Sequence, residues 1–123
     1  MTTTGTTQKI LINCQDGLNN IERATISLIL AVTASKTNET AMFVSAEASH
    51  LLVKGAVDDL QAPGYEPMAD LLHAYLQNGG QIWLCPACVK AKNLSADDLL
   101  DGVEIAGAPR TMAYLANGAQ LLA

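Results

Sequence analysis

Two cysteines spaced three residues apart are the side chains of this sequence best suited to covalent chemistry. They belong to the segment Cys85-Pro86-Ala87-Cys88, which directly follows the apolar run 82–84. Proline is favoured at the first position of a helix, so Cys85 is predicted to be an N-cap residue. Backbone N–H groups and the helix dipole at such a place lower the pKa of a thiol. We therefore predict a nucleophilic thiolate at Cys85, stabilised by the N–H groups of Ala87 and Cys88.

The second cysteine of the pair leaves several interpretations open. Cys88 is a candidate resolving thiol, which would form a disulfide with an oxidised or persulfidated Cys85. A Cys-x-x-Cys pair is also half of a zinc site, for which Cys14 and one of the two histidines, His50 or His73, would be needed. Neither histidine has the spacing of a zinc ligand, so we predict no metal and no cofactor. The remaining alternative is that the cysteines are structural core residues.

Length and composition indicate one small acidic domain. The chain has 123 residues, half of them hydrophobic, and a formal net charge of −5. This charge disfavours nucleic acids and anionic membranes as partners. No apolar run has the length of a membrane span, and the polar N-terminus has no signal-peptide pattern. Three cysteines without such a signal are typical of a cytoplasmic protein with reduced thiols. Residues 1–8 are expected to form a flexible arm before a domain at 9–123.

Strands and helices are predicted to alternate along the chain. This order is typical of an α/β domain in which helices cover both faces of a mostly parallel sheet, giving three layers related to flavodoxin. We expect strands at 9–14, 40–44, 82–84, 103–105 and 119–122, and helices at 21–35, 48–54, 67–77, 86–93, 96–102 and 110–116.

The predicted fold brings several polar or thiol residues to one edge of the sheet. Cys14 ends the first predicted strand, Ser45 follows the second, and Cys85 follows the third. In open parallel sheets, ligands bind at the carboxyl ends of the strands. We therefore expect Cys14, Asp16 and Ser45 as neighbours of the Cys85–Cys88 site.

Several segments together resemble the DsrE/DsrF/TusD-like sulfur-relay family, and especially its small single-domain members. They are 9–13 with Asp16, the segment 79–85, and 88–94 followed by 98–103. The resemblance implies a five-stranded α/β fold, a cytoplasmic location, and assembly into homotrimers or homohexamers. It also implies a persulfide carried on a cysteine after the third strand, the position that Cys85 occupies.

Two functions of different classes follow. In the first, the protein is a sulfur carrier or thiol-redox protein, similar to a sulfurtransferase, that holds a persulfide on Cys85 and exchanges it with a donor or acceptor protein. In the second, it is a non-catalytic homo-oligomeric module that binds a ligand or a protein, and its cysteines are structural. Both include self-association, because so small and apolar a chain is expected to cover apolar surface with copies of itself.

Overall fold

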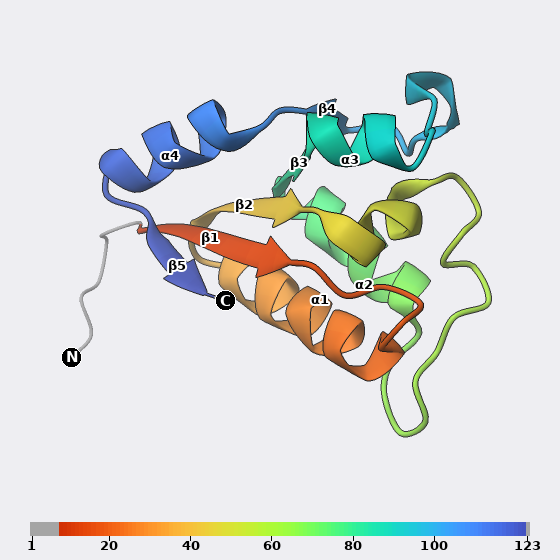
Figure 1. The fold of residues 1–123 in the computed structure, drawn as a ribbon. Coiled ribbons are helices and arrows are strands. Elements are labelled where there is room, and N and C mark those ends of the chain that lie inside the picture. Colours follow the sequence, from red (N-terminus) through yellow and green to blue (C-terminus); the bar gives the residue numbers. More distant parts are fainter. Residues whose placement is uncertain (1–7, 123) are drawn as a thin grey trace.

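The computed structural model describes residues 8–122, which form five parallel strands in one sheet with helices around it (Figure 1). The predicted N-terminal arm therefore lies almost wholly outside the described residues. The strand order across the sheet is β4-β3-β2-β1-β5, and every neighbouring pair is parallel. The elements are β1 (Lys9–Cys14), α1 (Ile21–Ser35), β2 (Glu39–Val44), the 3₁₀ segment η1 (Ala46–Leu52), α2 (Met68–Gln77), β3 (Gln81–Leu84), α3 (Pro86–Ala91), the 3₁₀ turn η2 (Ala96–Asp98), β4 (Val103–Ile105), α4 (Ala108–Ala116) and β5 (Gln120–Leu122).

The two faces of the sheet are covered unequally. Figure 1 shows α1 and α2 on one side of the sheet and α4 on the other. The larger hydrophobic core lies under α1 and α2, where alternate residues of the strands, such as Ile12 and Met42, are almost fully buried. A smaller cluster lies under α4, where the rings of Trp83 and Tyr114 meet edge to face at 5.1 Å. The predicted three-layer α/β fold is confirmed.

Local signals in the sequence explain where several elements begin. The side chain of Asn20 accepts a hydrogen bond from the N–H of Arg23 at 3.1 Å and caps α1. Such a side chain replaces the helical partner that the first N–H groups lack. Proline at the first position of α3 makes Cys85 its N-cap residue, as predicted.

Two predicted helices are wrong in type. The segment expected as a helix at 48–54 is a 3₁₀ segment that begins earlier, at Ala46, and the helix expected at 96–102 is a single 3₁₀ turn. Backbone hydrogen bonds between the two segments account for the difference, since Leu100 N–H donates to the carbonyl of Leu52 and Lys54 N–H to that of Asp98. Pairing with a distant segment takes the groups that a longer helix would need for itself.

Candidate functional site

The carboxyl ends of the three central strands form the edge that carries the thiols. In the sheet register, Cys14 pairs with Val44, and Val44 pairs with Leu84. The parallel ladder continues one step further, because Ser45 N–H donates to the carbonyl of Cys14 at 3.1 Å and Cys85 N–H donates to that of Val44 at 3.0 Å. The backbone thus places the residues after β1, β2 and β3 side by side, as the sequence predicts.

The start of α3 does not stabilise Cys85 in the predicted way. The N–H of Cys88 donates to the carbonyl oxygen of Cys85 at 3.1 Å, and the N–H of Val89 donates to the same oxygen. The Cys85 side chain accepts no capping hydrogen bond. The prediction that the N–H of Cys88 holds the Cys85 sulfur is therefore wrong, because the first turn of the helix uses that group, and no hydrogen bond joins Ala87 to the sulfur.

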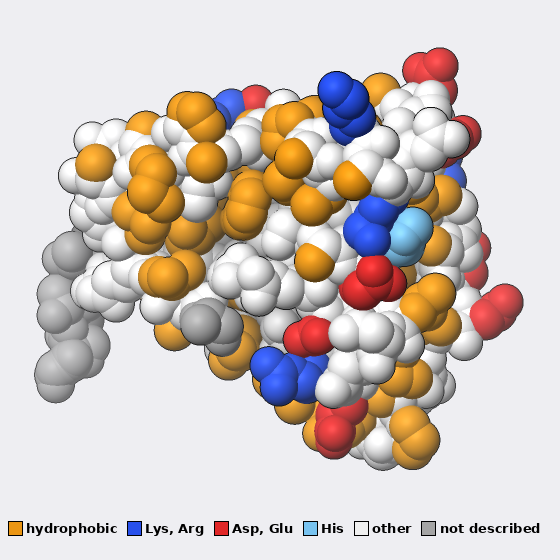
Figure 2. Space-filling view, in the orientation of Figure 1, with side chains coloured by type: hydrophobic (Ala, Val, Ile, Leu, Met, Phe, Trp, Pro, Cys, Tyr) orange, Lys and Arg blue, Asp and Glu red, His pale blue; other side chains and the backbone are white. Residues whose placement is uncertain are grey.

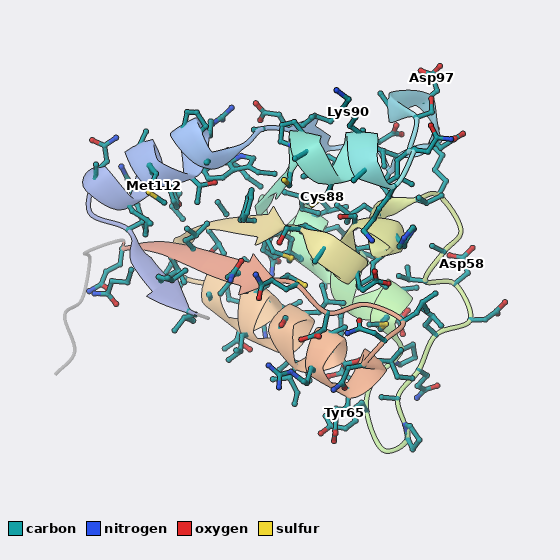
Figure 3. The ribbon with its side chains drawn as sticks, in the orientation of Figure 1. Asp58, Tyr65, Cys88, Lys90, Asp97 and Met112 are labelled. Atoms are coloured by element: carbon teal, nitrogen blue, oxygen red, sulfur yellow. The ribbon has the colours of Figure 1, made fainter. Side chains whose placement is uncertain are left out.

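The sulfur that accepts a backbone hydrogen bond is that of Cys88. The N–H of Ala46, at the start of η1, donates to the Cys88 Sγ, with 3.2 Å between nitrogen and sulfur. Figure 3 shows Cys88 on the side of α3 that lies toward η1. Ala46 has a φ of 53°, a left-handed conformation that is rare for alanine. Strained residues of this kind often occur at functional sites, where the surrounding structure holds them in place.

The surroundings of Cys88 favour its thiolate form. Partial burial raises the pKa of the Cys88 thiol, but four groups lower it by more, so that the net effect is a lowered pKa. The strongest of the four is the Ala46 N–H, followed by the nearby Cys85 thiol and Ser49 hydroxyl, and then by the charge of Lys92. A thiolate is the nucleophilic form of cysteine, so these contacts prepare Cys88 for nucleophilic attack.

Lys92 is itself held at the site by an ion pair. It lies four residues after Cys88, which places both side chains on the same face of the chain leaving α3. Its Nζ is 2.8 Å from a carboxylate oxygen of Glu47, and only 21% of its side chain is exposed. The bond to Lys92 lowers the pKa of Glu47, so the carboxylate stays ionised and keeps the ammonium in place.

Glycine at position 17 allows the loop after β1 to lie against η1. A Cβ at this position would overlap the backbone carbonyl of Glu47. The N–H of Ala48 also donates to the carbonyl of Gln15 at 3.2 Å, which joins the same two segments. The start of η1, which supplies the Ala46 N–H, is therefore held in place by the loop after β1 as well as by its contact with α3.

Two of the predicted neighbours lie apart from the pair. Cys14 is 2% exposed and belongs to the core under α1 and α2, where burial raises the pKa of its thiol to about 11. Asp16 instead binds Arg23, with 3.1 Å between the carboxylate oxygen and Nε. Ser45 is next to the site because it directly precedes Ala46, but its side chain makes no capping hydrogen bond to η1.

Ala46, Ser49 and Lys92 were not among the site residues predicted from the sequence. The spacing of Lys92 from Cys88 is a signal that points to a shared face, whereas nothing in the sequence marks Ala46.

Within residues 8–122, no group of three or more His, Cys, Asp or Glu side chains is arranged to hold a metal ion. In the same range, no helix is both long and apolar enough to cross a membrane.

The fold and the thiol pair define a parallel α/β domain with a cysteine site at its carboxyl edge. A family model described as DsrE/DsrF-like matches residues 8–123. The chain therefore belongs to the DsrE/DsrF-like family, as its sequence segments predict, and this family suggests a role of the sulfur-relay type.

Two uncharacterized archaeal proteins are similar in sequence to parts of the chain. An uncharacterized protein of Methanocaldococcus jannaschii is 30% identical over 80% of the chain, but the match spans only 36% of that relative. An uncharacterized protein of Methanopyrus kandleri is 32% identical over 69% of the chain and 68% of its own length. The chain thus covers little more than a third of the first of these relatives.

Solved structures share the fold. The ychN protein of E. coli superposes with a TM-score of 0.75 at 21% identity, covering 94% of this chain and 99% of its own. A protein of unknown function from Methanobacterium thermoautotrophicum gives a TM-score of 0.68 at 11% identity, with 95% of this chain and 98% of its own covered.

Proposed function

We propose that the protein is a cytoplasmic sulfur carrier in which the Cys85–Cys88 pair receives and holds one sulfane sulfur. The observation that carries this proposal is the hydrogen bond from the Ala46 N–H to the Cys88 sulfur, with the Cys85 thiol beside it. A thiolate held at an accessible edge is what attack on a donor persulfide requires. Both cysteines are free and partly exposed.

The first step assigns the attack to Cys88. Its thiolate attacks the terminal sulfur of a donor R–S–SH, a new sulfur–sulfur bond forms on Cys88, and the donor leaves as the thiolate R–S⁻. The electrons of the broken bond depart with the donor, so the step needs no separate oxidant or reductant. A lowered pKa favours this step through the larger thiolate fraction at neutral pH.

The second step moves the sulfur to Cys85. The Cys85 thiol loses its proton to solvent and attacks the terminal sulfur, which forms the Cys85 persulfide and releases Cys88 as a thiolate. A thiol of lower pKa is the better leaving group, so the same contacts that prepare Cys88 for attack also favour its release. An acceptor thiolate then takes the terminal sulfur from Cys85 in the same kind of exchange. In the absence of an acceptor, Cys88 resolves the persulfide, forming a Cys85–Cys88 disulfide and releasing hydrosulfide, and a cellular dithiol reduces the pair again.

Loading with a small-molecule persulfide, followed by intact-mass analysis, tests this proposal. At early times the parent protein should gain one sulfur mass, and peptide fragmentation should place that sulfur on Cys85. On longer incubation without an acceptor, this mass should be lost as the Cys85–Cys88 disulfide forms. We expect Cys88→Ser to load several-fold more slowly, Cys85→Ser to keep the sulfur on Cys88, and the double variant not to load. The matched control is Cys14→Ser, which should load like the parent because Cys14 is buried. Loading of the double variant at the parent rate would end the proposal.

We also propose that the chain forms a homo-oligomer, with homotrimers or homohexamers as the expected states, through the face that carries α4. Figure 2 shows hydrophobic side chains gathered over α4 and the strands beside it. Among them Met112 is 57% exposed and Leu121 52% exposed. A hollow with a volume of about 270 Å³ lies between α4 and the sheet, and its lining residues include Phe43 and Leu115. Exposed apolar surface of this kind favours contact with another chain.

Sedimentation at micromolar concentration tests the assembly. The parent should sediment as an oligomer, and Met112→Lys should shift it toward the monomer. Leu18→Lys is the matched control, because Leu18 is 62% exposed but lies in the loop after β1 rather than on the α4 face. A monomeric parent would contradict this part of the proposal.

A further inference from the structure

Ser49 has a buried hydroxyl group, and no contact within the fold explains why a polar group is buried there. The residue is 0% exposed, and its Oγ has no hydrogen-bond partner within residues 8–122. Buried hydroxyl groups nearly always have a partner, because an unsatisfied one loses its bonds to water without replacement. Trp83 Nε1 is likewise unpartnered, but Trp83 packs under α4, away from the thiols. Ser49 alone combines an unused donor with a place beside Cys88.

Ser49 belongs to η1, the segment whose first residue contacts Cys88. Ser49 follows Ala46 by three residues, and the Ala46 N–H is the group that lies 3.2 Å from the Cys88 sulfur. The Ser49 hydroxyl is also one of the nearby groups that lower the pKa of the Cys88 thiol.

The charged and titratable groups around this sulfur are few. From α3 and its end come Cys85, Lys90 and Lys92, and from η1 come Glu47 and His50. Lys92 favours an anion, and Glu47 is already paired with it at 2.8 Å. A hydroxyl that can donate to the sulfur adds a neutral donor to this set without adding charge.

We infer that Ser49 is a positioning residue that donates its hydroxyl hydrogen to the anionic sulfur of Cys88. The Ala46 N–H, the Ser49 hydroxyl and the charge of Lys92 then all favour the anionic form of the sulfur. When Cys88 is a neutral thiol or carries a persulfide, the hydroxyl loses its strongest acceptor, so this contact favours release of sulfur from Cys88. The inference deepens the proposed function and rests on it for its purpose, but the hydrogen bond itself is tested without any sulfur donor.

The test is the rate of Cys88 alkylation by iodoacetamide as a function of pH, measured by peptide mass. A Cys85→Ser background leaves a single thiol in that peptide. In this background, Ser49→Ala should raise the midpoint of the profile by about one pH unit, which is the size expected for losing one hydrogen bond to a charged group. At a pH low enough to keep Cys88 protonated, the hydroxyl has no charged acceptor, so the thermal midpoint of Ser49→Ala should stay the same or rise.

Ser45→Ala is the matched control, since it removes a hydroxyl group from the residue just before η1 and should leave the midpoint unchanged. The inference is overturned if Ser49→Ala leaves the alkylation midpoint where it is, or if the two variants shift it equally. The outcome is independent of sulfur loading. If the protein never accepts sulfur but Ser49→Ala shifts the alkylation midpoint, only the proposed function is refuted. If the protein loads normally but the midpoint does not shift, only the role of Ser49 is refuted.

Discussion

The left-handed backbone conformation of Ala46 leads to a prediction about stability. Replacing Ala46 by glycine should change the stability of the fold without changing the ionisation of Cys88. At a φ of 53°, the Cβ of alanine crowds the following carbonyl oxygen, which costs roughly 1–2 kcal/mol. Ala46→Gly removes this cost. The same change gives the unfolded chain more freedom, which costs roughly 0.5–1 kcal/mol. The difference leaves Ala46→Gly more stable by roughly 0–1.5 kcal/mol, a rise of up to about 7 °C in the thermal midpoint for a chain of this size.

Thermal and urea denaturation of the parent and the variant measure this difference. Glycine keeps the N–H that donates to the Cys88 sulfur, so the pH midpoint of Cys88 alkylation should not change. Asn93→Gly is the matched control, because Asn93 has a φ of 56° but asparagine tolerates the left-handed region better than alanine does. Its gain in stability should be smaller than that of Ala46→Gly.

An Ala46→Gly variant that is less stable than the parent by about 1 kcal/mol or more would show that Ala46 carries no backbone strain. A second contradicting result would be a shift of the Cys88 alkylation midpoint up to the ordinary thiol value. In that case the alanine side chain, rather than the fixed N–H, would be what holds the sulfur.

Three further predictions follow from contacts at the same edge. Lys92→Gln should raise the alkylation midpoint of Cys88 but change stability by less than about 1 kcal/mol in urea denaturation, because a partly exposed ion pair contributes little to folding. Gly17→Ala should destabilise the fold by roughly 1–3 kcal/mol, because its Cβ would overlap the Glu47 carbonyl, and thermal denaturation would show this. Cys14 keeps its proton in the folded state up to a pKa of about 11, whereas the unfolded chain loses it near 9. Stability should therefore fall as pH rises through this window, by up to about 3 kcal/mol for this group, and Cys14→Ala should show a shallower decline in urea titrations.

Much of the fold follows from local sequence signals. The apolar run 9–14 suits a strand with a helix layer on each face, and Asn20 supplies the cap that starts α1. Pro86 fixes the start of α3, and with it the place of Cys85 at the carboxyl edge. These signals act within a few residues of one another, so a single sequence contains them in full.

The side of the sheet that each cysteine side chain faces was harder to predict than the position of the cysteine relative to the strands. Successive side chains of a strand alternate between its two faces. Cys14 has the same parity as Ile12 and therefore enters the core under α1 and α2, although it stands at the end of a strand near the site. This alternation was present in the sequence and could have excluded Cys14 as a neighbour of the pair.

The support of Cys88 comes from distant segments and could not be predicted. The Ala46 N–H reaches the sulfur across 42 positions of the chain, and Lys92 meets Glu47 across 45. Alanine rarely adopts a left-handed conformation, so no rule of sequence marks Ala46 as such a residue. The helix start at Cys85 was the visible local signal, and it directed attention to the wrong sulfur of the pair as the stabilised anion.

The ionisation of Cys88 is the most direct test of this account. In a chain carrying Cys14→Ala and Cys85→Ser, Cys88 is the one remaining thiol, and its thiolate absorbance can be titrated without interference from another cysteine. A midpoint below the ordinary thiol value of about 8.5 is the expected result. A midpoint at or above that value would contradict the claim that η1 holds this sulfur as an anion.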